Sequence, residues 1–445
     1  MTLLHRRIVY ITFIIIFLIA TPLIVLYTQG YRYNFQKGRV QKTGILKITS
    51  TPKKAEIWLN GIKFDSKETP AKIEYVLPGD YEIRLQKSGY YNWQKKLTVY
   101  ENGTTFAENI LLFKQVLPAL ISSTSPAAWF PSPDQRQLAL ASGTKLYLLE
   151  FNDGLLANLL DTIQEKISVY DLPTTTVRAQ IMAWSPGGKK LLLSADDSNL
   201  KYYLVFDADS HKFQRIADNN YTALKWDQNN DNLLYAQYDA GLWQINISSG
   251  KISPALAIGT STDYLIDGAT IYYIQNGSLN ISRGSNTNKL PLDGCDSCRI
   301  KEFKHGRLIL LDTINQQLKF IDPTGNNKEI DAPAKAYSWL NNDVLLFYND
   351  WEIYIFDLNK KEPELITRLG QPITAAFWHP QGRHIFFASD NKIKAIELDN
   401  RELRNILTLA DNAAVKDLAI NRSGKDLFFN GSYNGQNGIF KLNLQ

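Results

Sequence analysis

The spacing of hydrophobic and polar positions changes twice along the chain. Residues 8–28 are almost uniformly apolar, and about 20 helical residues rise about 30 Å, which is enough to cross a bilayer core. From Gly44 to Phe113, short runs alternate between apolar and polar residues and are separated by turns about every ten residues, a pattern typical of β-strands. Beyond residue 114 strand-like runs recur to the end. The pattern predicts an N-terminal transmembrane helix and an all-β remainder.

These changes also place the domain boundaries. We expect a short basic tail at 1–7, a transmembrane anchor at 8–28, a basic linker at 29–43, a small β-sandwich at 44–113 and a repeat array at 114–445.

The apolar segment has two other interpretations, a cleaved signal peptide and a buried core helix. Its apolar run is longer than a typical signal core, and no cleavage site with small residues follows it. The absence of Cys near its end argues against a lipoprotein anchor. We therefore expect an uncleaved, single-pass anchor in the cytoplasmic (inner) membrane.

The charges beside this anchor give two opposing indications of orientation. Two Arg precede the span and four basic residues follow within 29–43, which alone favours a cytoplasmic body, although long domains translocate largely regardless of such charges. A short tail before a large β-rich body favours the N-terminus inside and the body extracytoplasmic. The stretch from Arg32 to Lys42 could then contact anionic lipid. A solvated linker is the interpretation that we prefer from sequence alone.

The alternating segment after Gly44 predicts a six-stranded β-sandwich. Ile45–Ile48 and Ala55–Leu59 alternate, and Asn60-Gly61 is a strong hairpin signal. The landmarks of this region, in order, are Thr51-Pro52-Lys53-Lys54-Ala55, Leu59-Asn60-Gly61, Thr69-Pro70, Pro78-Gly79-Asp80-Tyr81 and Gly89-Tyr90. They resemble the PEGA domain, although Lys54 stands where that family usually has Gly. The resemblance implies an extracytoplasmic spacer or adhesion module without catalytic residues.

A degenerate motif built on an aromatic residue and a turn recurs through the array. Its copies begin at Trp129, Trp184, Trp226, Tyr264, Phe303, Trp339, Trp378 and Leu418. A unit of about 40 residues with four short strands is typical of a β-propeller blade. The last unit ends after its third strand, and we expect Val116–Ser122 to supply the fourth. Eight blades are favoured, and seven blades plus an irregular unit is the alternative, since the fourth and fifth copies lack Trp.

The motif is most complete at Trp184-Ser-Pro-Gly-Gly-Lys. It resembles TolB-like, or WD40-like, propeller repeats, which implies a platform that binds a protein or another ligand. We expect the repeated aromatics to be structural and to pack between neighbouring blades. The Trp residues concerned are Trp129, Trp184, Trp226, Trp339 and Trp378.

Charge and composition narrow the function classes. The net charge of the whole chain is +5. Residues 1–113 alone carry a larger net positive charge, so residues 114–445 are mildly acidic. A mildly acidic body argues against a nucleic-acid partner. Only two Cys and two Met occur, which excludes a disulfide framework or a thiolate metal cage.

Few residues suggest chemistry. No familiar catalytic or nucleotide-binding motif occurs, and His379 and His384, the two His close in sequence, suit a blade turn and the following strand. Cys295 and Cys298 could form a local disulfide in an oxidising compartment or remain reduced thiols. The first motif interval carries about 14 extra residues, around 154–180, where Leu and Ile at helical spacing predict a short amphipathic helix. We predict no catalytic residue, no cofactor and no metal site.

The leading hypothesis is a non-catalytic binding scaffold. It would be anchored by residues 8–28 and would present the sandwich and the propeller outside the membrane to a protein or an envelope polymer. Two alternatives remain, namely a structural surface component whose sandwich contacts wall polymer, and a hydrolase or lyase with its site in the propeller channel.

Overall fold

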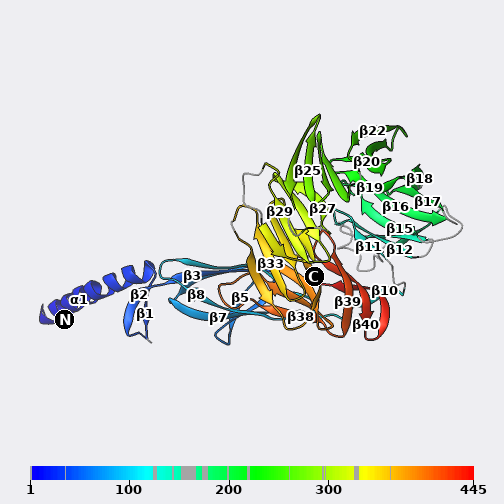
Figure 1. Ribbon diagram of the computed structural model, residues 1–445. Helices are drawn as coiled ribbons and strands as arrows, with labels where there is room; N and C mark the ends of the chain where they lie inside the picture. The colour runs from blue at the N-terminus through cyan, green and yellow to red at the C-terminus, as the bar shows by residue number, and fades with distance from the viewer. Residues whose placement is uncertain are drawn as a thin grey trace. The chain divides into compact units, whose positions relative to one another are not determined.

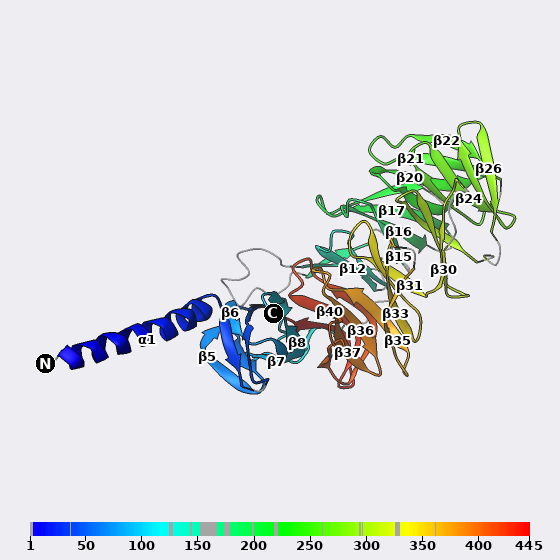
Figure 2. The same ribbon diagram turned by 90° about the vertical axis from the view of Figure 1, so that its left-hand side faces the viewer.

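The computed structural model describes residues 3–35, 37–123, 128–142, 145–151, 167–172, 179–197, 200–217, 221–259, 261–292, 295, 297–324, 330–360 and 362–445. The chain divides into two compact units. The first comprises Met1–Val116, Asp399–Asn405 and Gln445, and the second comprises Leu117–Leu398 and Ile406–Leu444. The predicted amphipathic helix at about 154–180 falls largely on residues outside the described ones. Figures 1 and 2 show the ribbon from two directions.

The first unit begins with one long apolar helix, α1 (Leu3–Thr28). His5–Thr28 has a mean hydropathy of 2.8, and none of its most apolar stretch is buried. By length and composition this helix can cross a membrane, and the same features suit a signal sequence. A two-stranded hairpin, β1 (Tyr31–Asn34) and β2 (Arg39–Lys42), follows directly. Residues 29–43, expected as a linker, therefore contain regular structure.

Two sheets form the β-sandwich after the hairpin. The first has the order β6-β3-β9 and the second β5-β4-β7-β8. The strands are β3 (Gly44–Thr51), β4 (Glu56–Leu59), β5 (Ile62–Glu68), β6 (Ala71–Val76), β7 (Gly79–Gln86), β8 (Trp93–Val99) and β9 (Thr104–Leu111). Leu46, Ile57 and Leu85 are fully buried between the sheets, as the alternation predicts.

The prediction of six strands is wrong, because the sandwich has seven. Thr69-Pro70 separates β5 from β6, and these two strands pair in different sheets. Asn60-Gly61 forms the expected hairpin between β4 and β5. Both residues have positive φ, 48° and 79°, as a two-residue turn that follows the twist of the strands requires.

The segment Asp399–Asn405 belongs to this first unit. The ammonium group of Lys95, whose side chain is fully buried, donates a hydrogen bond to the Asp399 carbonyl oxygen at 2.6 Å. The Lys96 amide donates to the Glu402 carboxylate at 2.6 Å. The segment is therefore hydrogen-bonded along β8.

The second unit consists, in its described residues, of eight four-stranded sheets, which we call blades 1 to 8. Blades 1 to 4 are β11–β14 (Ala128–Pro131, Gln137–Ser142, Lys145–Glu150, Ile167–Asp171), β15–β18 (Ala179–Trp184, Lys190–Asp197, Leu200–Asp207, Lys212–Ala217), β19–β22 (Thr222–Asp227, Asn230–Tyr238, Gly241–Asn246, Ile252–Ala257) and β23–β26 (Asp263–Asp267, Thr270–Gln275, Ser278–Arg283, Asn286–Pro291). Blades 5 to 7 are β27–β30 (Arg299–Lys304, Arg307–Asp312, Gln317–Ile321, Ile330–Pro333), β31–β34 (Ala336–Trp339, Val344–Tyr348, Glu352–Asp357, Glu364–Arg368) and β35–β38 (Ile373–Trp378, His384–Ser389, Lys392–Glu397, Ile406–Ala410).

Blade 8 joins the two ends of the array. It has the order β10-β41-β40-β39, with β39 (Ala413–Ile420), β40 (Asp426–Tyr433), β41 (Gln436–Asn443) and β10 (Ala119–Ser122). The prediction that Val116–Ser122 contains the missing fourth strand is confirmed, since Leu120 pairs with Phe440 in the antiparallel register. Blade 8 also shares a hydrophobic cluster with blade 1, in which Phe151 stacks on Phe428 at 4.7 Å between ring centroids.

Candidate binding face of the propeller

Most of the repeated aromatic residues connect their blade to the blade before it. The Trp184 indole donates to the Phe130 carbonyl oxygen at 2.8 Å, and the Trp226 indole donates to Ala183 at 3.4 Å. In blade 7, Trp378 donates to Ser338 at 3.2 Å. Trp184, Trp226 and Trp378 are all buried, so their rings fill the space between blades. Each indole N–H donates to a carbonyl oxygen in the first strand of the preceding blade.

Blade 4 uses a different residue type for the same contact. The Tyr264 hydroxyl is 2.5 Å from the Ala223 carbonyl oxygen and 2.6 Å from that of Tyr235, both in blade 3. Complete burial raises the pKa of Tyr264 well above its usual value, so the hydroxyl stays protonated and available as a donor. Lack of Trp in the fourth motif thus does not remove the inter-blade hydrogen bond.

Two Trp residues depart from this scheme. Trp339 donates its indole N–H to the Glu302 carboxylate at 2.6 Å rather than to a carbonyl, and Tyr337 donates to the same carboxylate oxygen at 2.8 Å. Burial, and then the Glu302 charge, raise the pKa of Tyr337 well above its usual value. Trp129 lies in blade 1 against blade 8, and its buried indole nitrogen has no hydrogen-bond partner in the described residues.

The first strands of neighbouring blades approach one another and bring charged side chains together. The Lys225 ammonium of blade 3 is 2.5 Å from the Asp263 carboxylate of blade 4. It also lies 3.3 Å from the Ile300 carbonyl oxygen of blade 5. The Ile300 amide in turn donates to Asp263 at 2.7 Å. One carboxylate and one ammonium group therefore join the inner strands of three successive blades.

Two further cations surround this pair. The Arg299 guanidinium donates to the Thr262 carbonyl oxygen at 2.6 Å, and Lys301 interacts electrostatically with both Asp263 and Arg299. We call Lys225, Asp263, Arg299 and Lys301 the inner cationic cluster. Its three cations face a single carboxylate, so the cluster has a surplus of positive charge.

Within the cluster Asp263 is buried and Lys225 is 31% exposed, whereas Arg299 and Lys301 are exposed. Desolvation lowers the pKa of Lys225 from its ordinary value, and Asp263 offsets only part of that effect. Desolvation also lowers the pKa of Lys301, again against the attraction of Asp263. An incoming carboxylate or phosphate would relieve the mutual repulsion of these cations in a partly dry setting. The arrangement is therefore suited to binding an anionic group.

This cluster was not predicted from the sequence, although a local signal was present. Lys225 immediately precedes the aromatic of its motif, as Asp263 precedes Tyr264 and Glu302 precedes Phe303. Charged residues next to a buried aromatic in successive first strands indicate a polar lining at the inner edge of the blades. That they meet one another depends on the ring geometry, which the local sequence does not show.

A second polar feature lies where blades 1 and 8 meet. A cavity of about 520 Å³ is lined by Arg136, Gln137, Glu150, Phe151 and Arg422. The two Arg belong to turns that follow the first strand of their respective blades. This cavity is open to solvent, and Arg136 already pairs with Asp134 at 3.6 Å.

His379 and His384 pack within the propeller. The Nδ1 atom of His379 accepts a hydrogen bond from the Gln381 amide at 3.2 Å, and its ring lies against Gly424 of blade 8. Burial lowers the pKa of His379 to about 4, so the ring is neutral at pH 7. His384 is also buried, with its ring centroid 6.3 Å from that of His379. Among the described residues, no three His, Cys, Asp or Glu side chains form a potential metal site.

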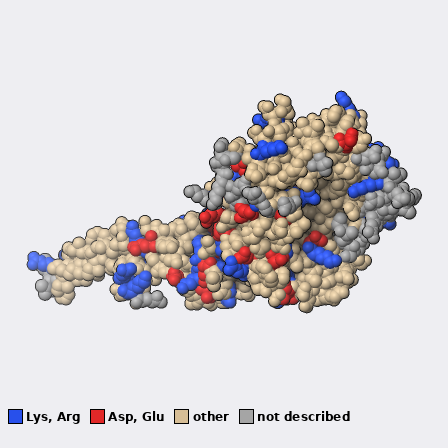
Figure 3. All heavy atoms as spheres, in the orientation of Figure 1, with Lys and Arg blue, Asp and Glu red and all other residues tan. Residues whose placement is uncertain are grey.

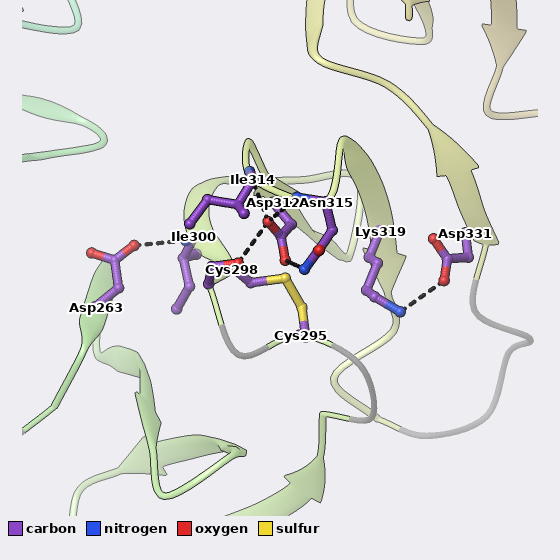
Figure 4. The surroundings of a disulfide bond; sticks show 10 residues. Asp263, Cys295, Cys298, Ile300, Asp312, Ile314, Asn315, Lys319 and Asp331 are labelled. Carbon is purple, nitrogen blue, oxygen red and sulfur yellow. Dashed lines mark hydrogen bonds and ion pairs between the residues drawn. A yellow bond between two sulfur atoms is a disulfide. The ribbon is translucent and has the colours of Figure 1, made fainter.

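Cys295 and Cys298 form a disulfide between blades 4 and 5 (Figure 4). Both are buried in the hydrophobic cluster that the two blades share. Ser297, between them, donates to the buried Asp312 carboxylate at 2.7 Å. Burial alone would raise the pKa of Asp312, but hydrogen bonds from Asn315, Ser297 and Ile314 outweigh it and lower the pKa.

Comparisons with known proteins agree with these two units. The PEGA domain family matches residues 43–111. Among solved structures, the C-terminal WD40 domain of Sif2 superposes with a TM-score of 0.50 at 15% identity, over 73% of this chain and 98% of that domain.

Two other structures are similar at lower scores. PorZ, a bacterial surface component of the type-IX secretion system of Porphyromonas gingivalis, has a TM-score of 0.40 at 11% identity, over 71% of this chain and 43% of PorZ. A eukaryotic initiation factor has a TM-score of 0.48 at 13% identity, over 75% of this chain and 90% of that structure. No protein of curated function matches the chain. The chain thus carries a PEGA domain at residues 43–111, followed by a WD40-like β-propeller.

Proposed function

We propose that this protein is a non-catalytic binding scaffold held at the outer face of the cytoplasmic membrane. In this proposal α1 remains as a single-pass anchor, and the PEGA domain and the propeller lie outside. The propeller would bind an acidic segment of a partner protein at the inner cationic cluster. The observation that carries the proposal is the surplus of positive charge around the buried Asp263 carboxylate, where the first strands of blades 3, 4 and 5 meet.

Two features support the placement. α1 is long and apolar enough to span a bilayer, with no residue of its most apolar stretch buried. The disulfide between Cys295 and Cys298 suits an oxidising compartment outside the cytoplasm, since cytosolic thiols are usually kept reduced.

Site-specific photo-crosslinking of the full chain in its native cells tests the binding claim. A photoreactive residue in place of Lys301 should capture one dominant protein. The same residue in place of Lys289, which is exposed on the outermost strand of blade 4, should not. Equal capture at both positions would contradict binding at the cluster, and capture of wall polymer at 301 would favour a structural role instead.

Charge reversal supplies a second test at the same site. With the photoreactive residue kept at position 301, Arg299→Glu should weaken capture of that partner severalfold, because the acidic segment would face a cluster without surplus positive charge. Lys289→Glu changes the net charge equally and should leave capture unchanged. If both variants weaken capture to the same extent, general electrostatic attraction rather than the cluster explains the binding.

A further inference from the structure

The hairpin that follows α1 is attached to the end of that helix. Arg32 donates hydrogen bonds to the carbonyl oxygens of Tyr27 and Tyr31 at 2.7 and 2.8 Å, and its guanidinium lies 3.6 Å from the centre of the Tyr27 ring. At the other end of the hairpin, Thr43 donates from its amide and its hydroxyl to the Gly30 carbonyl oxygen. If α1 crosses a bilayer, these contacts keep the hairpin at the membrane surface.

The two faces of the hairpin differ. Tyr33 pairs directly with Val40, so the two side chains lie on the same face. Asn34, Gln41 and the exposed Arg39 lie on the other. Asn34 and Gln41 are buried, each 4% exposed. Tyr33 and Val40 are about half exposed, and Phe35, which follows β1 toward the tip, is 88% exposed. One face is therefore packed, while the other presents aromatic and aliphatic side chains to the surroundings.

The charge on this hairpin has one sign. Lys37 and Arg39 are exposed near the tip, and no Asp or Glu occurs in the chain before Glu56. Glu101 is the acidic side chain that reaches the base of the hairpin, where it accepts a hydrogen bond from the Lys42 amide at 3.2 Å. Figure 3 shows a group of Lys and Arg below the end of the helix and a group of Asp and Glu above it. Aromatic rings beside cations are typical of residues at a lipid–water interface.

We propose that the β1–β2 hairpin binds the anionic phospholipid headgroups of the bilayer that α1 crosses. Phe35 and Tyr33 would enter the interfacial region, and Lys37 and Arg39 would contact the phosphates. The proposal rests on the membrane anchorage proposed above. It replaces the solvated linker that the sequence alone favoured, because an exposed apolar face on a two-stranded ribbon has no stabilising partner in water.

The test is amide hydrogen exchange of the full chain in nanodiscs of phosphatidylcholine alone or mixed with phosphatidylglycerol. Each basic residue at an anionic surface contributes roughly a fivefold change in equilibrium constant, so Lys37 and Arg39 together predict exchange in residues 31–42 slower by roughly 25-fold in the anionic discs. The β4–β5 hairpin, residues 56–68, is the internal reference and should exchange equally in both. Added salt should reduce the difference.

Matched variants separate charge from packing. The double variant Lys37→Glu, Arg39→Glu should abolish the lipid-dependent slowing, whereas Lys53→Glu, Lys54→Glu, which reverses two exposed charges on the sandwich, should retain it. Phe35→Ser should weaken the protection. Ile62→Ser, which alters an apolar side chain 75% exposed in the reference hairpin, should not.

The possible failures can be told apart. If the chain does not enter nanodiscs of either composition, the anchorage proposal fails. If it enters and residues 31–42 exchange at the same rate in both lipids, the headgroup proposal is overturned while the anchor stands. Protection in native membranes but not in phosphatidylglycerol discs would assign the hairpin to a protein partner and would also overturn it.

Discussion

At the residue scale, the inner cationic cluster depends on its single carboxylate, Asp263. Asp263 is buried and accepts hydrogen bonds from Lys225 and from the Ile300 amide. Asp263→Ala would leave the buried Ile300 amide without its acceptor and Lys225 without its counter-ion, which should destabilise the propeller by about 2 kcal/mol after discounting for the partial exposure of Lys225. Thermal unfolding of the full chain measures this. Asp411→Ala, which removes an ion pair with Lys392 whose two side chains are 63% and 40% exposed, should cost under about 1 kcal/mol. Equal destabilisation by the two variants would contradict this prediction.

The buried histidine predicts a pH dependence of stability. The pKa of His379 is about 4 in the folded protein against 6.5 ordinarily. Between pH 4 and pH 6.5 this histidine is therefore protonated in the unfolded chain but neutral in the folded protein. Stability should therefore be complete above pH 6.5 and fall as the pH drops toward 4, by about 3 kcal/mol in total. His379→Asn removes this titration. The thermal unfolding midpoint of the wild type should therefore fall relative to that of the variant as the pH drops from 6.5 to 4. A difference between the two midpoints that stays constant over this pH range would refute the burial argument.

At the element scale, closure of blade 8 depends on a close backbone approach. A Cβ at Gly438 would lie 2.3 Å from the Ser122 carbonyl oxygen of β10, so Gly438→Ala should loosen the β10–β41 pairing and cost about 1–3 kcal/mol. Faster amide exchange of residues 119–122 would report it. Gly370→Ala, where a Cβ would meet nothing within 4 Å, is the control. Unchanged exchange in Gly438→Ala would show that β10 is not held as described.

The sequence predicted most elements and missed how some combine. The recurrent motif predicted the blades, because it is a local pattern that repeats about every 40 residues. The last repeat has only three strands of its own, and this predicted that β10 supplies the fourth. The pairing of β5 and β6 with different sheets and the hydrogen bonding of Asp399–Asn405 along β8 are long-range facts. Tyr264 is intermediate between these cases. The sequence showed only that this copy of the motif lacks Trp, whereas its hydroxyl forms the inter-blade hydrogen bond that Trp forms elsewhere.

At the scale of the whole molecule, the disulfide reports the compartment. If the body is extracytoplasmic, the peptide containing Cys295 and Cys298, isolated from native membranes after alkylation without reductant, should carry no alkyl group and should gain two only after reduction. Mass spectrometry measures this. Complete alkylation without reductant would show reduced thiols and would favour a cytoplasmic body.

The central claim is that α1 anchors a binding platform outside the cytoplasmic membrane. Digestion of intact spheroplasts with an added protease, followed by detection of the propeller with an antibody, tests it most directly. The account predicts that the body is degraded or released while a cytoplasmic marker stays intact. A body that resists the protease until the membrane is lysed, and is then digested, would contradict it.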